Sequence, residues 1–308
     1  MSKLKKALER AKKVRSEDVH ESETGSKLRR AVKKAQKKAG PEQPMAKRSM
    51  PERTMAQRSM PEPTMPEQTK SDEVRITYTR TKILDIDPKN LKKNKIFSHI
   101  KEDRMIDQIN ILRTQLLHKL EEINGSTLMV TSANPGEGKT FTSINLGISI
   151  AQELNRTVLL VDCDLRQPEG THFDFASDFF GVEIHQGLSD YLLGQANLDE
   201  ILFNPGIERL TILPGGKPML NSAELLSSPK MEMLVQEMKT RYGKDRVVIF
   251  DSPSILTISD PLAFARFVDG ILLVVESNKS TKEDIKTTME LLKDRVILGT
   301  VLNKFKPI

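Results

Sequence analysis

The residues best suited to chemistry lie in the stretch ANPGEGKT, residues 133–140, where an apolar run ends and a glycine-rich turn begins. Gly136 and Gly138 permit backbone angles and a close approach that a side chain would block. Backbone N–H groups from the proline onward can therefore surround an anion, and a helix that begins near Lys139 adds the positive end of its dipole. The stretch fits the pattern of a phosphate-binding loop in which Ala133 replaces the first glycine.

Two side chains of this loop indicate that the anion is a magnesium nucleotide. In the pattern, the ammonium group of Lys139 reaches the β- and γ-phosphates, and the hydroxyl group of Thr140 ligates Mg²⁺. The pattern alone has many chance matches, but its place between a predicted strand and a predicted helix makes this match more specific. The residues predicted to bind the nucleotide here are Asn134, Pro135, Gly136, Glu137, Gly138, Lys139, Thr140 and Phe141.

Three aspartates follow apolar runs of four or more residues, where a hard cation could use them. Asp162 and Asp164 end the stretch VLLVDCD, and Asp251 ends VVIFD. One such aspartate commonly caps a loop, but three favour a metal site because Mg²⁺ prefers oxygen ligands. Cys163, between the two acids, is more simply a small core residue than a nucleophile.

The elements that must position these groups follow from hydrophobic periodicity after about residue 80. Short runs that are apolar on both faces alternate with helical patterns, which indicates a parallel sheet covered by helices on both sides. We therefore predict a doubly wound α/β domain over residues 80–308, with its ligand at the carboxyl ends of the strands. Amphipathic helices are predicted over 106–123 and 231–242. The predicted strands are 127–132, 157–162, 209–214, 246–251, 270–276 and 296–304.

The first 80 residues differ in composition. Residues 1–40 hold 14 Lys and Arg against 5 Asp and Glu, and two related segments place Ala-rich apolar faces at helical spacing. We interpret them as basic amphipathic helical repeats, which either fray in solvent or bind an anionic membrane surface or a partner. Residues 41–79 repeat a Met/Pro/Glu-rich decapeptide and are predicted to form a disordered linker.

Composition also excludes several classes of protein. A single cysteine excludes an intramolecular disulfide. The longest apolar run, 271–275, is far shorter than the roughly 20 residues of a membrane-spanning helix. The opening MSKLKKALERAKK carries charges where a signal peptide has its apolar core. His172 and His185 lack metal-ligand spacing and are predicted to lie at the surface. We expect a soluble, cytoplasmic protein.

Several motifs in order resemble one family. They are TSANPGEGKT, VLLVDCDLRQP, GLSDYLLG, LPGGKPMLNSAELLSS, VVIFDSPSILTISDPLAFARFVDGILLVVES and GTVLNK. Over about residues 80–308 the chain resembles the bacterial tyrosine autokinases of exopolysaccharide loci, the chain-length-determinant group related to the cell-division and partitioning ATPases. The resemblance implies a P-loop NTPase fold of the deviant Walker type, with ATP and Mg²⁺ as cofactors and phosphoryl transfer to protein tyrosine as the reaction.

The resemblance also implies roles for single residues. Thr140, Asp162 and Asp251 would ligate Mg²⁺, and Lys139 would take part in catalysis. Either Asp162 or Asp164 would activate the attacking hydroxyl group. The sequence does not decide between these two residues, because their acidity depends on burial and on distance from the metal. The resemblance implies roles for two further residues. Arg166 would stabilise the negative charge that develops on the phosphate, and Asn303 would contact the purine.

The chain departs from the family pattern at several positions. Asn134 stands where the partitioning ATPases have lysine, which argues against a spatial-patterning ATPase. Ser254 replaces the second proline after the Walker B aspartate. The helix that carries a Glu-x-x-Arg-x-x-Arg motif for ring assembly in the family has Asp107, Asn110 and Arg113 here. A homo-oligomer is expected, but its assembly by that helix is in doubt.

The phosphate acceptor stays open. The family's C-terminal tyrosine cluster follows the last strand, whereas the residues after Asn303 read KFKPI. Tyr191 and Tyr242 lie in helical patterns, which leaves Tyr78 as the accessible candidate. The main hypothesis is a kinase-like regulator of exopolysaccharide chain length and export, recruited to the inner face of the cell membrane and activated by a segment of a membrane co-polymerase partner. The alternatives are a nucleotide-gated ATPase switch and, least favoured, a partitioning-type ATPase that binds nucleic acid or membrane through its basic tail.

Overall fold

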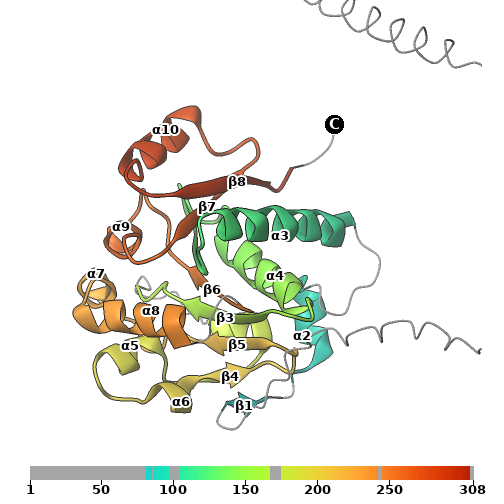
Figure 1. The fold of residues 1–308 in the computed structure, drawn as a ribbon, viewed down its shortest axis with the longest axis vertical. Coiled ribbons are helices and arrows are strands. Elements are labelled where there is room, and N and C mark those ends of the chain that lie inside the picture. The colour runs from blue at the N-terminus through green and yellow to red at the C-terminus, as the bar shows by residue number, and fades with distance from the viewer. Residues whose placement is uncertain (1–80, 85, 97–103, 167–174, 242–244, 306–308) are drawn as a thin grey trace, which may run out of the picture. The chain divides into compact units, whose positions relative to one another are not determined.

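The computed structural model covers most of the predicted domain (Figure 1). The predicted basic repeats (1–40) and the predicted linker (41–79) lie outside the described residues, as do Tyr78, His172 and Tyr242. The described residues are 81–84, 86–96, 104–166, 175–241 and 245–305.

Eight strands of the described residues form one sheet. In sheet order they are β1 (Lys82–Ile83), β4 (Phe203–Asn204), β5 (Leu210–Leu213), β3 (Thr157–Asp162), β6 (Arg246–Asp251), β2 (Thr127–Ser132), β7 (Gly270–Glu276) and β8 (Ile297–Asn303). Neighbouring strands are parallel except for β4 and β5. The chain runs from β2 outward to β3 and later outward on the other side to β7 and β8, so the predicted doubly wound α/β fold is confirmed.

Helices connect the strands. They are α2 (Pro88–Lys93), α3 (Arg104–Glu122), α4 (Lys139–Ala151), the π-helical turn η2 (Ala176–Phe180), α5 (Leu188–Leu192), α6 (Leu198–Ile201), α7 (Ser222–Leu226), α8 (Pro229–Arg241), α9 (Asp260–Phe264) and α10 (Lys282–Leu291). The two predicted amphipathic helices correspond to α3 and α8, with bounds shifted by one or two residues. None of the helices in the described part of the chain combines the length and the apolar character of a bilayer span.

Alternate residues of each central strand point to opposite faces of the sheet and build two halves of the core. In β2, Leu128 and Val130 pack with α3 and α4, whereas Met129 packs on the other face with α5, α8 and α9. Both faces are covered, which is why the middle of each central strand is a continuous apolar run. Figure 1 shows α3 and α4 packed next to each other, as their contacts require.

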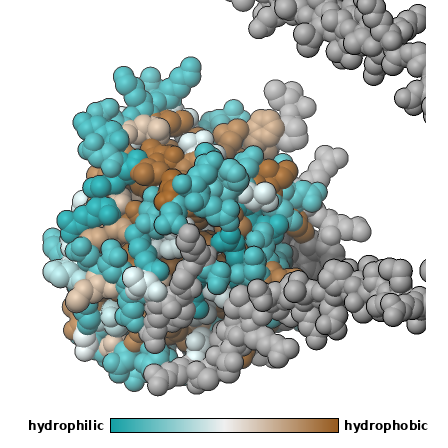
Figure 2. Space-filling view, in the orientation of Figure 1, coloured by the Kyte–Doolittle hydropathy of each residue, from teal (hydrophilic) through white to brown (hydrophobic). Residues whose placement is uncertain are grey.

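The outer surface is mixed in character. On the face drawn in Figure 2, hydrophilic residues surround small hydrophobic patches. Single exposed apolar side chains are normal for a folded domain, since polar residues do not suffice to cover it. Examples among the described residues are Ile111, Leu302 and Phe305, which are more than half exposed.

Candidate active site

Strand pairing brings the predicted acidic residues together. β3 and β6 are parallel neighbours, and Asp162 pairs with Asp251 at their carboxyl ends. β2 lies on the other side of β6 and leads directly into the glycine-rich loop. The loop and both strand-terminal acids therefore meet at one edge of the sheet, as the sequence predicted.

The loop has the conformation that its glycines allow. Gly136 and Gly138 have φ angles of +79° and +97°, and α4 begins at Lys139, immediately after Gly138. Gly138 is the N-cap of α4 and has no side chain to bond the first helical N–H groups. These donors thus remain available for an anion at the positive end of the helix dipole.

Lys139 is held among the acids. Its Nζ lies 3.3 Å from Oδ2 of Asp164, and the lysine side chain is 15% exposed. Burial lowers the pKa of Lys139, but the carboxyl groups of Asp251, Asp164 and Asp162 raise it by more, so its pKa lies above the ordinary value. The ammonium group is therefore charged at neutral pH.

Asp251 is buried with one oxygen satisfied and one free. Its Oδ1 accepts a hydrogen bond of 2.9 Å from the hydroxyl group of Ser143, whereas Oδ2 is buried without a hydrogen-bond partner. Burial raises the pKa of Asp251 to about 6, although Lys139, Thr140 and Ser143 act in the opposite direction. A buried carboxylate oxygen without a donor is suited to a cation or to a cation-bound water.

The other two acids differ in exposure. Asp162 is 7% exposed, and its Oδ1 accepts a hydrogen bond of 2.9 Å from the backbone N–H of Asp164. Burial and the nearby carboxylates of Asp251 and Asp164 raise the pKa of Asp162 well above its ordinary value. Asp164 is 25% exposed and carries the contact with Lys139; burial raises its pKa as well.

These residues fit Mg²⁺ held jointly with a nucleotide. Three carboxylates face one ammonium group in a space largely shielded from water, so a bound cation would relieve the excess negative charge. Within the described residues no three acidic, histidine or cysteine side chains are already arranged as a complete metal cage. Mg²⁺ seldom needs one, since it usually keeps several waters and takes one or two carboxylates plus the substrate's phosphates.

Two predicted residues lie outside both the loop and the aspartates, and only one of them contacts the loop. Arg166 is exposed, and among the described contacts none joins its side chain to the loop or the aspartates. Asn303 ends β8 beside the loop, where its Nδ2 donates a hydrogen bond of 2.8 Å to the carbonyl oxygen of Glu137. Its contact with a purine stays a prediction.

Among the described residues, several that contact the predicted site were not found from the sequence: Ser143, Gly215, Ser280, Asp284 and Lys304. Ser143 could have been, because it follows Thr140 by three residues on a helix and so lies on the same side. Gly215 approaches Asp162 so closely that a Cβ would stand 2.9 Å from the carboxylate oxygen Oδ2. Ser280 and Lys304 lack a local signal, since each meets the loop across more than 140 residues of chain.

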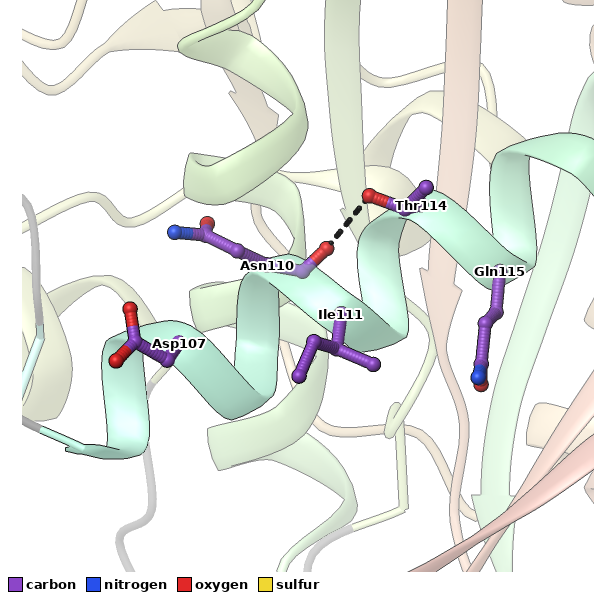
Figure 3. Close-up of a pocket in the computed structure, with 5 residues that line it drawn as sticks. All are labelled: Asp107, Asn110, Ile111, Thr114 and Gln115. Atoms are coloured by element: carbon purple, nitrogen blue, oxygen red, sulfur yellow. Dashed lines mark hydrogen bonds between the residues drawn. The ribbon is translucent and has the colours of Figure 1, made fainter.

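The cavity beside Asp162 and Asp164 is small, about 10 Å³, or roughly one water. Its described lining is Asp162, Asp164, Leu165, Phe175, Pro214, Gly215, Gly216 and Pro218. A much larger cavity of about 610 Å³ lies away from the acids, along the exposed side of α3 (Figure 3).

The α3 cavity is lined by Asp107 and Asn110, two of the three positions that the family pattern links to ring assembly. Its described lining is Asp107, Asn110, Ile111, Thr114 and Gln115. Arg113, the third position, faces α4 instead. It donates to the carbonyl oxygen of Ser149 at 3.0 Å and pairs with Glu153 at 3.1 Å. The one surviving arginine of the pattern thus stabilises the packing of α3 on α4.

Comparison with known proteins identifies the family. The model of the AAA domain matches residues 125–297, more than half of the chain. Tyrosine-protein kinase YwqD of Bacillus subtilis is 33% identical over 199 residues, which cover 64% of this chain and 80% of YwqD. The chain belongs to the bacterial tyrosine-protein kinase family. This confirms the resemblance read from the motifs.

Two further comparisons show which part of the related proteins this chain matches. Tyrosine-protein kinase etk of Escherichia coli (strain K12) is 31% identical over 203 residues, which cover 65% of this chain but only 27% of that protein. The solved VpsO kinase domain aligns with a TM-score of 0.56 and 29% identity, covering 66% of this chain and 97% of that domain. The shared part is therefore the kinase domain.

Proposed function

We propose that this chain is an ATP-dependent protein-tyrosine kinase that transfers the γ-phosphoryl group of Mg-ATP to a tyrosine hydroxyl group. The observation that carries the proposal is the convergence of Lys139, Asp162, Asp164 and Asp251 on the glycine-rich loop. The names of YwqD and etk, both tyrosine-protein kinases, support a kinase rather than a partitioning ATPase.

The residues divide into binding and proton-accepting groups. The loop amides and Lys139 would bind the phosphates, and Thr140 with Asp251 and Asp162 would hold Mg²⁺, which neutralises phosphate charge when bound. We assign proton removal to Asp164, which is more exposed than Asp162 and so more accessible to an incoming tyrosine. When Lys139 turns to the phosphates, the carboxylate of Asp164 loses its partner and can accept the tyrosine proton.

We further propose the cellular role implied by the family: regulation of exopolysaccharide chain length and export together with a membrane co-polymerase. Residues 1–40 would assist recruitment to an anionic membrane surface, because they are rich in Lys and Arg. Residues 80–308 would form the nucleotide-binding domain. The chain would form homo-oligomers, but not through Asn110 and Arg113 of α3, because both side chains already bond Ser149 of α4.

Calorimetric titration with Mg-ATP tests the site, and detection of phosphotyrosine after incubation with ATP tests the reaction. The parent should bind Mg-ATP, and Lys139→Met should reduce affinity at least about a hundredfold, because it removes the cation that contacts two phosphates. Equal binding by parent and variant would show that the nucleotide site is misassigned. A phosphotyrosine signal that is lost in Tyr78→Phe would identify the acceptor; binding and ATP hydrolysis without any signal would favour the nucleotide-gated switch.

A further inference from the structure

Glu137 was predicted to bind the nucleotide as part of the loop, but the proposed mechanism gives its side chain no role of its own. Its carboxylate is fully buried, and both oxygens accept hydrogen bonds. Oε2 accepts from the backbone N–H of Asn134 at 3.1 Å, and Oε1 accepts from the hydroxyl group of Ser280. A buried charge is tolerated only when it is paired or hydrogen-bonded, so these two contacts maintain the side chain inside the loop.

Ser280 is held so that its proton points to Glu137. It lies between β7 and α10, and its Oγ accepts a hydrogen bond of 2.8 Å from the backbone N–H of Glu276. Because this donor occupies one side of the oxygen, the hydroxyl proton is left for the carboxylate. Glu137 thus links the loop after β2 to the segment after β7, the next strand of the sheet.

Two side chains at the end of β8 hold the neighbouring peptide groups of the loop. Asn303 donates to the carbonyl oxygen of Glu137 at 2.8 Å, and Lys304 donates to the carbonyl oxygen of Gly136 at 2.7 Å. In a trans peptide the N–H points opposite to the C=O. The N–H groups of Glu137 and Gly138 must therefore point away from β8, to the side where the phosphates are expected.

We propose that Glu137 is a positioning residue: its carboxylate, anchored by Ser280, holds the loop in the conformation that aims these N–H groups at the nucleotide. The side chain itself does not touch the phosphates. This inference rests on the proposed nucleotide site and adds that the segment after β7 sets its affinity.

The test is Mg-ATP affinity of the full chain by calorimetry, with kcat and KM for ATP. Ser280→Ala leaves a buried carboxylate oxygen without its donor, so the dissociation constant and KM should rise about tenfold. kcat should change much less, because the loop amides bind the phosphates before and during transfer. Ser280→Thr retains the hydroxyl group and should restore parent affinity.

Two controls separate positioning from stability. Asp87→Ala, on a different element, removes the side chain that caps α2 by accepting the N–H of Lys89 at 2.8 Å. It should lower the melting temperature by about 2–4 °C and leave affinity within about twofold of the parent. In a Glu137→Ala background, which removes the acceptor, Ser280→Ala should have little further effect on affinity, since the two residues act through one contact.

The outcomes are distinct. If the parent does not bind Mg-ATP, the proposed nucleotide site fails. If the parent binds and a folded Ser280→Ala variant binds equally well, or if Ser280→Ala weakens binding equally in both backgrounds, the positioning role is overturned. Should Ser280→Ala fail to fold, Ser280→Cys preserves the side-chain size with a weak S–H donor and should still weaken binding; parent-like binding by that variant would also overturn the proposal.

Discussion

Replacing Gly138 with alanine tests the geometry of the loop directly. At its φ of +97° an L side chain is strained, which costs about 1–2 kcal/mol. The new Cβ would stand 2.0 Å from Nδ2 of Asn303, so that side chain must move and lose its hydrogen bond to Glu137. The lost bond adds about 0.5–1.5 kcal/mol. Gly138→Ala should therefore lower the free energy of unfolding by about 1.5–3.5 kcal/mol.

Alanine variants at two other glycines distinguish the cost of backbone strain from the cost of the steric clash with Asn303. Gly136 has a φ of +79°, but the nearest atom to its added Cβ is Nζ of Lys279, at 3.7 Å. Gly136→Ala should therefore cost only the backbone part, about 1–2 kcal/mol. Gly299 has open space within 4 Å, so Gly299→Ala should destabilise by no more than about 0.5 kcal/mol.

Urea denaturation of the three variants and the parent measures these differences, and Mg-ATP titration shows whether affinity follows. The expected order of destabilisation is Gly138→Ala, then Gly136→Ala, then Gly299→Ala. If Gly138→Ala is as stable as Gly299→Ala, the left-handed loop and its contact with Asn303 are wrong.

Two further predictions concern the acids and α3. Because burial raises the folded-state pKa of Asp251 to about 6, the stability it contributes is present below its unfolded pKa near 4 and is lost as pH rises through about 6. Without nucleotide, the free energy of unfolding should fall by up to about 3 kcal/mol over that pH range. Urea denaturation at several pH values should show a weaker pH dependence for Asp251→Asn than for the parent. Equal pH profiles of the two proteins would contradict the raised pKa of Asp251. Arg113→Ala removes the contacts with Ser149 and Glu153, so it should lower the free energy of unfolding by about 1–2 kcal/mol in the same urea measurement. The control variant Gln115→Ala, on the same helix, should change that free energy by no more than about 0.5 kcal/mol. Equal stability of these two α3 variants would show that Arg113 does not support the packing.

The fold was predictable because its central strands are buried on both faces, so each contains a short continuous apolar run. The predictions for β2, β3, β6 and β7 agree with the structure at both ends. The predictions for β5 and β8 are one residue too long at each end. The two-residue strands β1 and β4 were missed. Strands this short have no periodicity of their own and form only because a partner lies beside them.

The candidate site also has one part that the sequence predicted and one part that only the tertiary structure revealed. Sequence alone was enough to predict that the loop, Asp162, Asp164 and Asp251 would meet at one edge of the sheet, because a glycine pattern and strand-terminal acids are local features. Tertiary structure decided which groups meet these residues. The order β2-β7-β8 brings Ser280, Asn303 and Lys304 against the loop. Contacts over such distances along the chain depend on strand order and packing, which local patterns do not encode.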